Sequence, residues 1–287
     1  MMKMKSLHIR SYAKINLCLN ITGKREDGYH ELDMVMLPIS LHDSLVVSKL
    51  NKSTDNFVTV DDFSLGSFNY NLASFSIDKL ESIYHFKQKF RILIHKVIPI
   101  QAGLGGGSSN AACALKAVNT LLNLGATDEE LMEIGKSLGC DIPFFVKCIP
   151  ARCKGIGEII EPISIKNNYY VLLVKPDAGC PTKDVYQAAD SMDLPICNVD
   201  NVVKALEEGD DDLLAANISN ALQGPAISLV PAIQTIIDEL HDCGLKIVQQ
   251  TGSGSAVFAL STDKKLLKKI FKQFENKYQV EMAKVLK

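Results

Sequence analysis

Several features that would place a protein in a class at once are missing from this sequence. Its longest apolar runs, such as residues 169–174, are far shorter than the roughly 20 residues that cross a bilayer. Its formal charge is −2, so it lacks the basic excess typical of nucleic-acid binding. The lysines within residues 1–10 precede no apolar segment, which argues against a signal peptide. We therefore expect neither a membrane nor a nucleic acid as partner.

The eight cysteines include no Cys-x-x-Cys pair, and no spacing of His and Cys fits a zinc site. Two of them, Cys113 and Cys243, lie inside apolar helical patterns. Scattered, reduced thiols are typical of cytosolic proteins. We therefore expect a cytoplasmic protein without structural zinc.

What is present is an ordinary folded composition, with 47% apolar and 22% charged residues. A chain of 287 residues suits two domains or one large one. The chain turns polar at Asn167 and Asn168, just before an apolar run. We therefore place a boundary near residue 165, between an N-terminal domain over residues 1–165 and a C-terminal domain over residues 166–287.

The second of these domains has a mixed pattern. A helix that ends near Cys243 is followed by strands over residues 246–250 and 256–260, which a Gly-Ser turn joins as a hairpin, and then by a helix from Asp263. Together they predict an α+β unit. In the first domain, residues 49–70 are polar and rich in turn residues, which predicts a variable hairpin.

Residues 15–21 alternate strictly between apolar and polar side chains, which predicts a strand. The apolar positions share one face, so Lys14 and Asn16 point together to the opposite face. That polar face is either a solvent-exposed edge or a functional surface.

A glycine-rich segment over residues 103–109, Gly-Leu-Gly-Gly-Gly-Ser-Ser, stands between a strand and a helix. The strand alternates over residues 90–94, and the helix has an apolar stripe at positions 112, 115, 118 and 122. A capping box from Thr127 to Glu130 opens a second helix. Glycine loops that lead into a helix are typical of phosphate sites.

Two well-known phosphate loops fit this segment poorly. Residues 103–108 are one position away from the dinucleotide fingerprint, and Asp128 follows about 20 residues later. However, Asp128 opens a helix instead of ending a strand, and residues 99–102 separate the strand from the glycines. A dinucleotide oxidoreductase is therefore the disfavoured alternative. The Gly-Lys-Ser at residues 135–137 lacks the first glycine of a P-loop.

A third interpretation is a loop whose backbone N–H groups wrap a polyphosphate, with the cation supplied from elsewhere in the chain. Successive glycines let the backbone approach a ligand closely. Ser108 and Ser109 add hydroxyls for phosphate or for Mg²⁺. The alternative is a plain turn in which Ser108 caps the helix, but four glycines within residues 103–107 exceed what a cap needs.

Three segments together carry a resemblance to a known family: Ala13 to Leu17, Pro99 to Ala112, and Thr251 to Phe258. Their order and spacing resemble the GHMP superfamily of small-molecule kinases, named for galactokinase, homoserine kinase, mevalonate kinase and phosphomevalonate kinase. Within it, residues 23–30 (Gly-Lys-Arg-Glu-Asp-Gly-Tyr-His) and 139–145 (Gly-Cys-Asp-Ile-Pro-Phe-Phe) are similar to the 4-diphosphocytidyl-2-C-methyl-D-erythritol kinases of the non-mevalonate isoprenoid pathway.

The resemblance implies an α+β, two-domain GHMP-kinase fold, with a ribosomal-S5-like N-terminal domain, a ferredoxin-like C-terminal domain and the active site between them. It implies that ATP, with Mg²⁺, phosphorylates the 2-hydroxyl of a cytidine diphosphate conjugate of methylerythritol. That small molecule is the expected partner, and we expect a monomer or a weak homodimer.

The resemblance also assigns the catalytic pair, with Asp141 as the catalytic aspartate and Lys14 as its partner lysine. Phosphoryl transfer mainly needs alignment, charge neutralisation and a carboxylate that accepts the hydroxyl proton. Asp141 stands next to an apolar run, where a charge usually has a partner.

The remaining site residues follow from the same resemblance. The ATP-binding set is Pro99, Ala102, Gly103, Leu104, Gly105, Gly106, Gly107, Ser108, Ser109, Asn71, Leu72 and Lys96. The substrate-binding set is Asn16, Tyr29, His30, Thr182, Tyr186, Gly252, Ser253 and Gly254. Two tyrosines would enclose the cytosine ring while His30 reads its edge. The Mg²⁺ ligands stay open, with Ser108 and Ser109 as candidates.

One departure from the family pattern lies on the substrate side, where Asp177 replaces a glycine. Two alternatives to the main interpretation also stay open. One is a kinase of the same superfamily that acts on mevalonate or homoserine, and the other is a catalytically silent paralogue that only senses the ligand.

Overall fold

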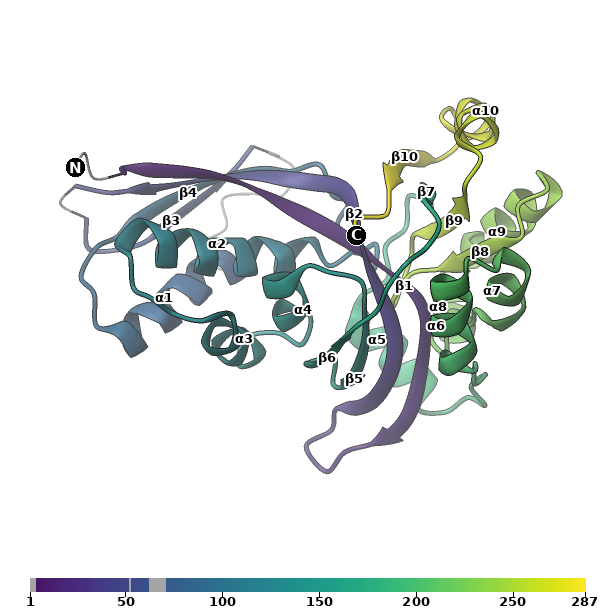
Figure 1. Ribbon diagram of the computed structural model, residues 1–287, viewed down its shortest axis with the longest axis horizontal. Helices are drawn as coiled ribbons and strands as arrows, with labels where there is room; N and C mark the ends of the chain where they lie inside the picture. Colours follow the sequence, from purple (N-terminus) through teal and green to yellow (C-terminus); the bar gives the residue numbers. More distant parts are fainter. Residues whose placement is uncertain (1–3, 52, 62–70) are drawn as a thin grey trace. The chain divides into compact units, whose positions relative to one another are not determined.

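The computed structural model describes residues 4–51, 53–61 and 71–287, and the chain divides into two compact units (Figure 1). The first unit takes the chain up to Ala13, His42–Ile98 and Gly105–Cys148. The second takes Lys14–Leu41, Pro99–Leu104 and Ile149–Lys287. The long strands β1 (Ser6–Lys24) and β2 (His30–Lys49) pair with each other and contribute residues to both units.

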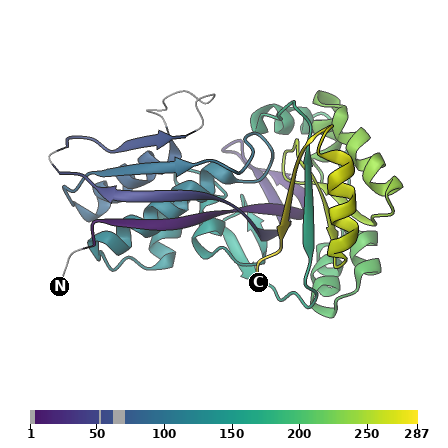
Figure 2. The same ribbon diagram turned by 90° about the horizontal axis from the view of Figure 1, so that it is seen from above.

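The first unit is a sheet with helices on one face (Figures 1 and 2). Strand β4 (Phe90–His95) pairs antiparallel with β2 and parallel with β3 (Phe57–Val60). The helices are α1 (Leu72–Tyr84), α2 (Gly106–Leu122), α3 (Asp128–Lys136) and α4 (Ile142–Lys147). The alternation of β4 turns Phe90, Ile92 and Ile94 into the core, where they are fully buried.

Local signals in the sequence explain where these helices begin. The capping box is present as predicted: the side chains of Thr127 and Glu130 each accept a hydrogen bond from the other residue's backbone N–H. Helix α2 starts within the glycine segment, and its predicted stripe is buried at Ala112, Leu115 and Val118. Leu121, instead of Leu122, completes the stripe.

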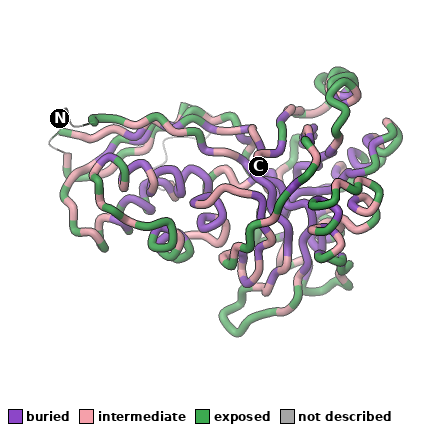
Figure 3. The backbone as a smooth tube through the Cα atoms, viewed as in Figure 1, coloured by how far each residue is buried: buried purple, intermediate pink, exposed green. Residues whose placement is uncertain are grey.

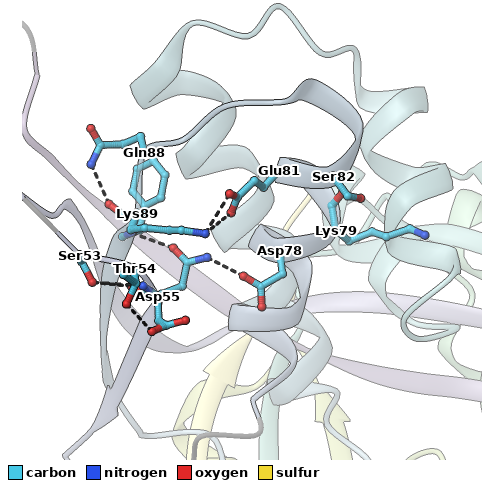
Figure 4. Close-up of polar contacts among 11 residues, drawn as sticks. Ser53, Thr54, Asp55, Asp78, Lys79, Glu81, Ser82, Gln88 and Lys89 are labelled. Carbon is cyan, nitrogen blue, oxygen red and sulfur yellow. Dashed lines mark hydrogen bonds and ion pairs between the residues drawn. The ribbon is translucent and has the colours of Figure 1, made fainter.

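Polar contacts join the segment before β4 to α1 and to the chain at Leu50, and Figure 4 shows the pair of Lys89 with Glu81 in α1. The ammonium of Lys89 pairs with Glu81 at 2.7 Å, and the Gln88 amide donates to the Leu50 carbonyl at 2.7 Å. The hairpin predicted over residues 49–70 is wrong in its described part, because β3 pairs with β4 and runs parallel to it. Residues 52 and 62–70 of that prediction lie outside the described residues.

The second unit contains a four-stranded antiparallel sheet in the order β10-β7-β9-β8. Its strands are β7 (Tyr170–Lys175), β8 (Ile247–Gln250), β9 (Val257–Ser261) and β10 (Gln279–Lys284). The predicted order of elements is confirmed: α9 (Ala232–Asp242) precedes the β8–β9 hairpin, and α10 (Lys264–Phe274) begins after Asp263, whose carboxylate caps it. This is the predicted α+β unit.

The other elements of the second unit are β5 (Ala151–Gly155), β6 (Ile159–Pro162), α5 (Thr182–Ala189), α6 (Val199–Glu208), α7 (Asp211–Asn217) and α8 (Gln223–Leu229). Strand β5 pairs antiparallel with β2 and with β6. Buried residues run along the strands, and exposed ones gather at loops and outer helices (Figure 3). None of the helices in the described residues is long and apolar enough to span a membrane.

Candidate active site

Lys14 and Asn16 lie side by side on β1 and are almost completely buried, at 4% and 2% exposure. The Lys14 ammonium donates a hydrogen bond to Oδ1 of Asn16. The interpretation of this strand face as a solvent-exposed edge is therefore wrong. Burial of an ammonium costs free energy unless it has hydrogen-bonding or charged partners. This face of β1 therefore carries a buried positive charge that Asn16 helps to stabilise.

Thr251 joins this face of β1 to the glycine segment. Its hydroxyl accepts from the Asn16 backbone N–H at 2.9 Å and donates to the Gly103 carbonyl at 3.3 Å. Thr251 is fully buried. The loop between β8 and β9, a plain hairpin turn by its sequence, thus fixes both the strand that carries Lys14 and the first part of the glycine segment.

Two glycines permit this close packing. Gly103 has a φ of +71°, and a Cβ added there would lie 2.0 Å from the Thr251 carbonyl oxygen. A Cβ on Gly252, whose φ is +55°, would lie 3.2 Å from the Lys14 ammonium nitrogen. Both positions need a left-handed backbone; a Cβ on Gly103 would clash, and one on Gly252 would be in very tight contact.

Backbone hydrogen bonds hold the rest of residues 99–104 in the second unit. The Leu104 carbonyl accepts from the Lys14 N–H at 3.1 Å, and the Ala102 carbonyl accepts from the Ala256 N–H at 3.4 Å. On the other side of the β8–β9 loop, the hydroxyls of Ser253 and Thr182 are 3.0 Å apart. The structure therefore brings together eight of the predicted site residues: Lys14, Asn16, Ala102, Gly103, Leu104, Thr182, Gly252 and Ser253. Thr251 and Asn220 belong to the same group but were not predicted. Asn220 donates to the Gly252 carbonyl at 2.8 Å from behind the loop.

The first turn of α2 carries the other part of the glycine segment. Gly105 is the residue that precedes the helix, with a φ of +71° and no side-chain cap, so the alternative in which Ser108 caps the helix is wrong. The N–H groups of a first helical turn have no partner within the helix and attract anions. Ser109 is buried and its hydroxyl accepts from Ser11 at 2.7 Å, whereas Ser108 is only half-buried.

Lys96 lies over this first turn. Its ammonium nitrogen is 3.2 Å from the place where a Cβ on Gly106 would be. It is held there by Asp43, a fully buried carboxylate that accepts from the Lys96 ammonium at 2.6 Å. Asp43 also accepts from the N–H groups of Val97 and Ile98, both at 2.8 Å, and from the Asn110 amide at 3.1 Å.

The predicted residues Asn71 and Leu72 begin α1 beside the same turn. The Asn71 side chain caps α1 by accepting from the Ala73 N–H at 2.9 Å. A Cβ on Gly107 would lie 3.8 Å from Leu72 Cδ1. Within the first unit, Leu72 and Lys96 therefore flank the glycine turn.

Asp43 carries a stability prediction, because removing its charge leaves the Lys96 ammonium and two backbone N–H groups without their shared acceptor. We expect Asp43→Ala to lower the free energy of unfolding by about 3 kcal/mol, measured by urea denaturation. The matched control is Asp61→Asn, since the exposed Asp61 carboxylate also accepts from the Lys96 backbone N–H at 2.9 Å. Equal losses in the two variants would contradict this account of Asp43.

Asp141 is in the first unit and directly precedes α4, where it is half-buried and makes no side-chain cap. The segment before it lies against the start of α2, because a Cβ on Gly139 would be 3.9 Å from the Ser108 hydroxyl. The predicted catalytic carboxylate thus belongs to the same unit as the uncapped helix turn. Lys14 belongs to the second unit.

The predicted cytidine residues lie in the second unit. The rings of His30 and Tyr186 are stacked, with centroids 5.0 Å apart and an angle of 28° between the planes. His30 Nε2 is 2.8 Å from Oδ1 of Asp190, a residue that no motif in the sequence marks. Tyr29 is 53% exposed. Among the described residues, no three or more His, Cys, Asp or Glu side chains are grouped to hold a metal ion.

Comparison with known proteins shows which family the chain belongs to. The family model of the GHMP kinases N terminal domain matches residues 71–148, and that of the GHMP kinases C terminal matches residues 202–280. The 4-diphosphocytidyl-2-C-methyl-D-erythritol kinases of Caldicellulosiruptor bescii and Clostridium perfringens are 35% and 34% identical to this chain. The first match covers 90% of both chains, and the second covers 95% of both. The chain belongs to this family of GHMP kinases.

Solved structures agree with the family. A crystal structure of 4-(cytidine 5'-diphospho)-2C-methyl-D-erythritol kinase has a TM-score of 0.81 and 29% identity, and covers 97% of this chain and 99% of its own. The homoserine kinase of Cytophaga hutchinsonii, at 18% identity and a TM-score of 0.77, shares the fold, with 100% of this chain and 96% of its own covered. The predicted GHMP-kinase fold and family are confirmed, and the dinucleotide alternative is wrong.

Proposed function

We propose that this kinase transfers the γ-phosphoryl group of ATP to the 2-hydroxyl of 4-diphosphocytidyl-2-C-methyl-D-erythritol. The observation that carries the proposal is the first turn of α2, which has no side-chain cap and has the Lys96 ammonium over it. Unpaired N–H groups beside a fixed cation suit a polyphosphate. The names of the relatives supply the acceptor substrate.

The phosphates of ATP would lie along residues 99–109, with Asn71, Leu72 and Lys96 beside the nucleotide. The glycines at 105–107 leave the backbone N–H groups within reach of phosphate oxygens. Mg²⁺ would neutralise charge between the phosphates. The candidate oxygen ligands for it are the hydroxyls of Ser108 and Ser109, of which Ser109 already accepts one hydrogen bond from Ser11.

Asp141 would accept the proton of the substrate hydroxyl as the phosphoryl group arrives. Lys14 would supply positive charge to the same reaction, because phosphoryl transfer is catalysed mainly by positioning and by charge stabilisation. Asn16, bonded to the Lys14 ammonium, would position both that ammonium and the methylerythritol. Gly252, Ser253 and Gly254 would contact the substrate from the loop that Thr251 anchors.

The cytidine would bind near Tyr29, His30, Thr182 and Tyr186. We predicted that two tyrosines enclose the cytosine ring. The Tyr186 ring instead stacks on the His30 imidazole, so we propose that Tyr186 supports His30. In this arrangement His30 would recognise the edge of the cytosine by hydrogen bonding.

The remaining predictions also stand as proposals. We place the ATP-binding kinase domain at residues 1–165 and the ferredoxin-like domain at 166–287, with the two family models on either side of that boundary. The compact units group the chain differently, since Lys14–Leu41 and residues 149–165 belong to the same unit as the C-terminal part. The cysteines of the described residues are all free thiols, which supports a cytoplasmic location. A monomer or a weak homodimer is the assembly that we propose.

The test is ADP release from Mg-ATP with three candidate acceptors: 4-diphosphocytidyl-2-C-methyl-D-erythritol, mevalonate and homoserine. Of these three acceptors, we expect only the cytidine conjugate to be phosphorylated. Turnover with mevalonate or homoserine instead would favour the other kinase types of the superfamily. Nucleotide binding without turnover on any of the three would favour a silent paralogue.

A further inference from the structure

One imidazole in the second unit is held by two residues of the same helical face. Tyr186 lies in α5, and Asp190 is the residue that ends this helix. Residues four apart lie one above the other on a helix, so both can face the same neighbour. That neighbour is His30 at the start of β2, which stacks on the Tyr186 ring and bonds to Asp190.

The hydrogen bond defines where His30 carries its proton. Oδ1 of Asp190 is 2.8 Å from Nε2 of His30, and Oδ2 accepts from the Lys24 ammonium at 2.6 Å. The hydrogen bond from Lys24, and then that from His30, lower the pKa of the Asp190 carboxyl. Asp190 is therefore ionised at neutral pH and can only accept hydrogen bonds. Nε2 must carry a proton, and Nδ1 is an acceptor when the ring is neutral.

The geometry points to Asp190 as a positioning residue that makes the site select cytosine over uracil, by holding the tautomer of His30. Cytosine presents an amino donor at C4, whereas uracil presents a carbonyl acceptor there. An acceptor at Nδ1 therefore pairs with cytosine and opposes uracil. Because Tyr186 covers one face of the imidazole, a base cannot stack on that face. The inference rests on the proposed function, in which a cytidine nucleotide is the substrate.

His30 is also well placed to discriminate. Its side chain is 11% exposed, while those of Asp190 and Lys24 are 36% and 54% exposed. The imidazole is thus mostly enclosed, and an unmatched polar group there would be costly. We expect CDP to bind about ten- to a hundred-fold more tightly than UDP.

The experiment compares CDP and UDP affinities of the full chain by calorimetry, in the native protein and in Asp190→Asn. The amide of asparagine can donate to Nε2, which moves the imidazole proton to Nδ1. We expect the ratio of CDP to UDP affinity to fall to near one in Asp190→Asn. Nitrogen-15 NMR of His30 should show the Nε2–H tautomer in the native protein and its loss in the variant. A merely structural role would not change the tautomer.

Two further variants make the comparison sharp. Asp184→Asn removes an exposed carboxylate from the first turn of the same helix and should leave the affinity ratio and the His30 spectrum unchanged. Asp190→Glu keeps an acceptor and should recover part of the ratio. An unchanged ratio in Asp190→Asn, or an Nδ1–H tautomer in the native protein, would overturn the inference.

These outcomes are separable from failure of the proposed function. Native protein that prefers CDP, shows the Nε2–H tautomer and loses the preference in Asp190→Asn, yet phosphorylates nothing, supports the inference and overturns the kinase activity. Native protein that phosphorylates the cytidine conjugate while Asp190→Asn keeps its preference for CDP overturns the inference alone. Native protein that binds CDP and UDP equally overturns the inference whatever its activity.

Discussion

Asp141→Asn is expected to lower kcat by about 10²- to 10⁴-fold, while the KM for ATP and for the cytidine conjugate changes little. The asparagine has nearly the same shape but cannot accept the hydroxyl proton. Because the carboxylate makes no side-chain cap at the start of α4, its replacement removes no helix cap. The measurement is steady-state ADP release, with thermal unfolding of the variant as the check on folding.

The matched control is Asp128→Asn. Asp128 is an exposed carboxylate at the first residue of α3 in the same unit, and it is the acidic residue that a dinucleotide site would have used. We expect this variant to keep the native kcat. An Asp141→Asn enzyme that turns over as fast as the Asp128→Asn enzyme would remove Asp141 from the role of base.

Gly103→Ala is expected to lower the free energy of unfolding by about 2–5 kcal/mol. The left-handed backbone of Gly103 disfavours any side chain, and the new Cβ would lie 2.0 Å from the Thr251 carbonyl oxygen. Relief requires the backbone of the glycine segment or of the β8–β9 loop to shift. Because the same loop anchors Asn16 through Thr251, we also expect a large loss of kcat. Urea denaturation and ADP release measure the two effects.

Gly125→Ala separates the two causes. Gly125 has a φ of +76°, close to that of Gly103, but a Cβ there would meet nothing within 4 Å. Gly125→Ala should therefore lower the free energy of unfolding only by the cost of a left-handed backbone, about 1–2 kcal/mol. Its kcat should equal that of the native protein. Equal losses in the two variants would mean that contact with Thr251 adds nothing.

Much of the local structure could be predicted because its causes lie close together in the sequence. The alternation of residues 90–94 specified β4, and the capping box at Thr127 specified the start of α3. The Gly-Ser turn after residue 250 predicted a hairpin, which forms between β8 and β9. The failure at residues 49–70 has a matching reason: turn residues mark where a strand ends, but the parallel pairing of β3 with β4 depends on a crossover through α1.

The candidate site was predictable only where a motif marked it. The glycine segment and the Lys14 face of β1 were found in this way. Thr251 could not be seen as their anchor, because its partner Gly103 is 148 positions away. Asp43 and Asp190 carried no signal, since their importance arises from partners 53 and 160 positions distant. A single carboxylate in a sequence does not reveal which donors the fold brings to it.

The central claim is the transfer of phosphate from ATP to one hydroxyl of the cytidine conjugate, and the product tests it most directly. Incubation of the protein with Mg-ATP and 4-diphosphocytidyl-2-C-methyl-D-erythritol, followed by phosphorus-31 NMR of the product, locates the new phosphate. We predict one ADP released per product molecule and a single new phosphomonoester on the 2-hydroxyl of the erythritol. No ADP above background, or a phosphate at another position, would contradict the account.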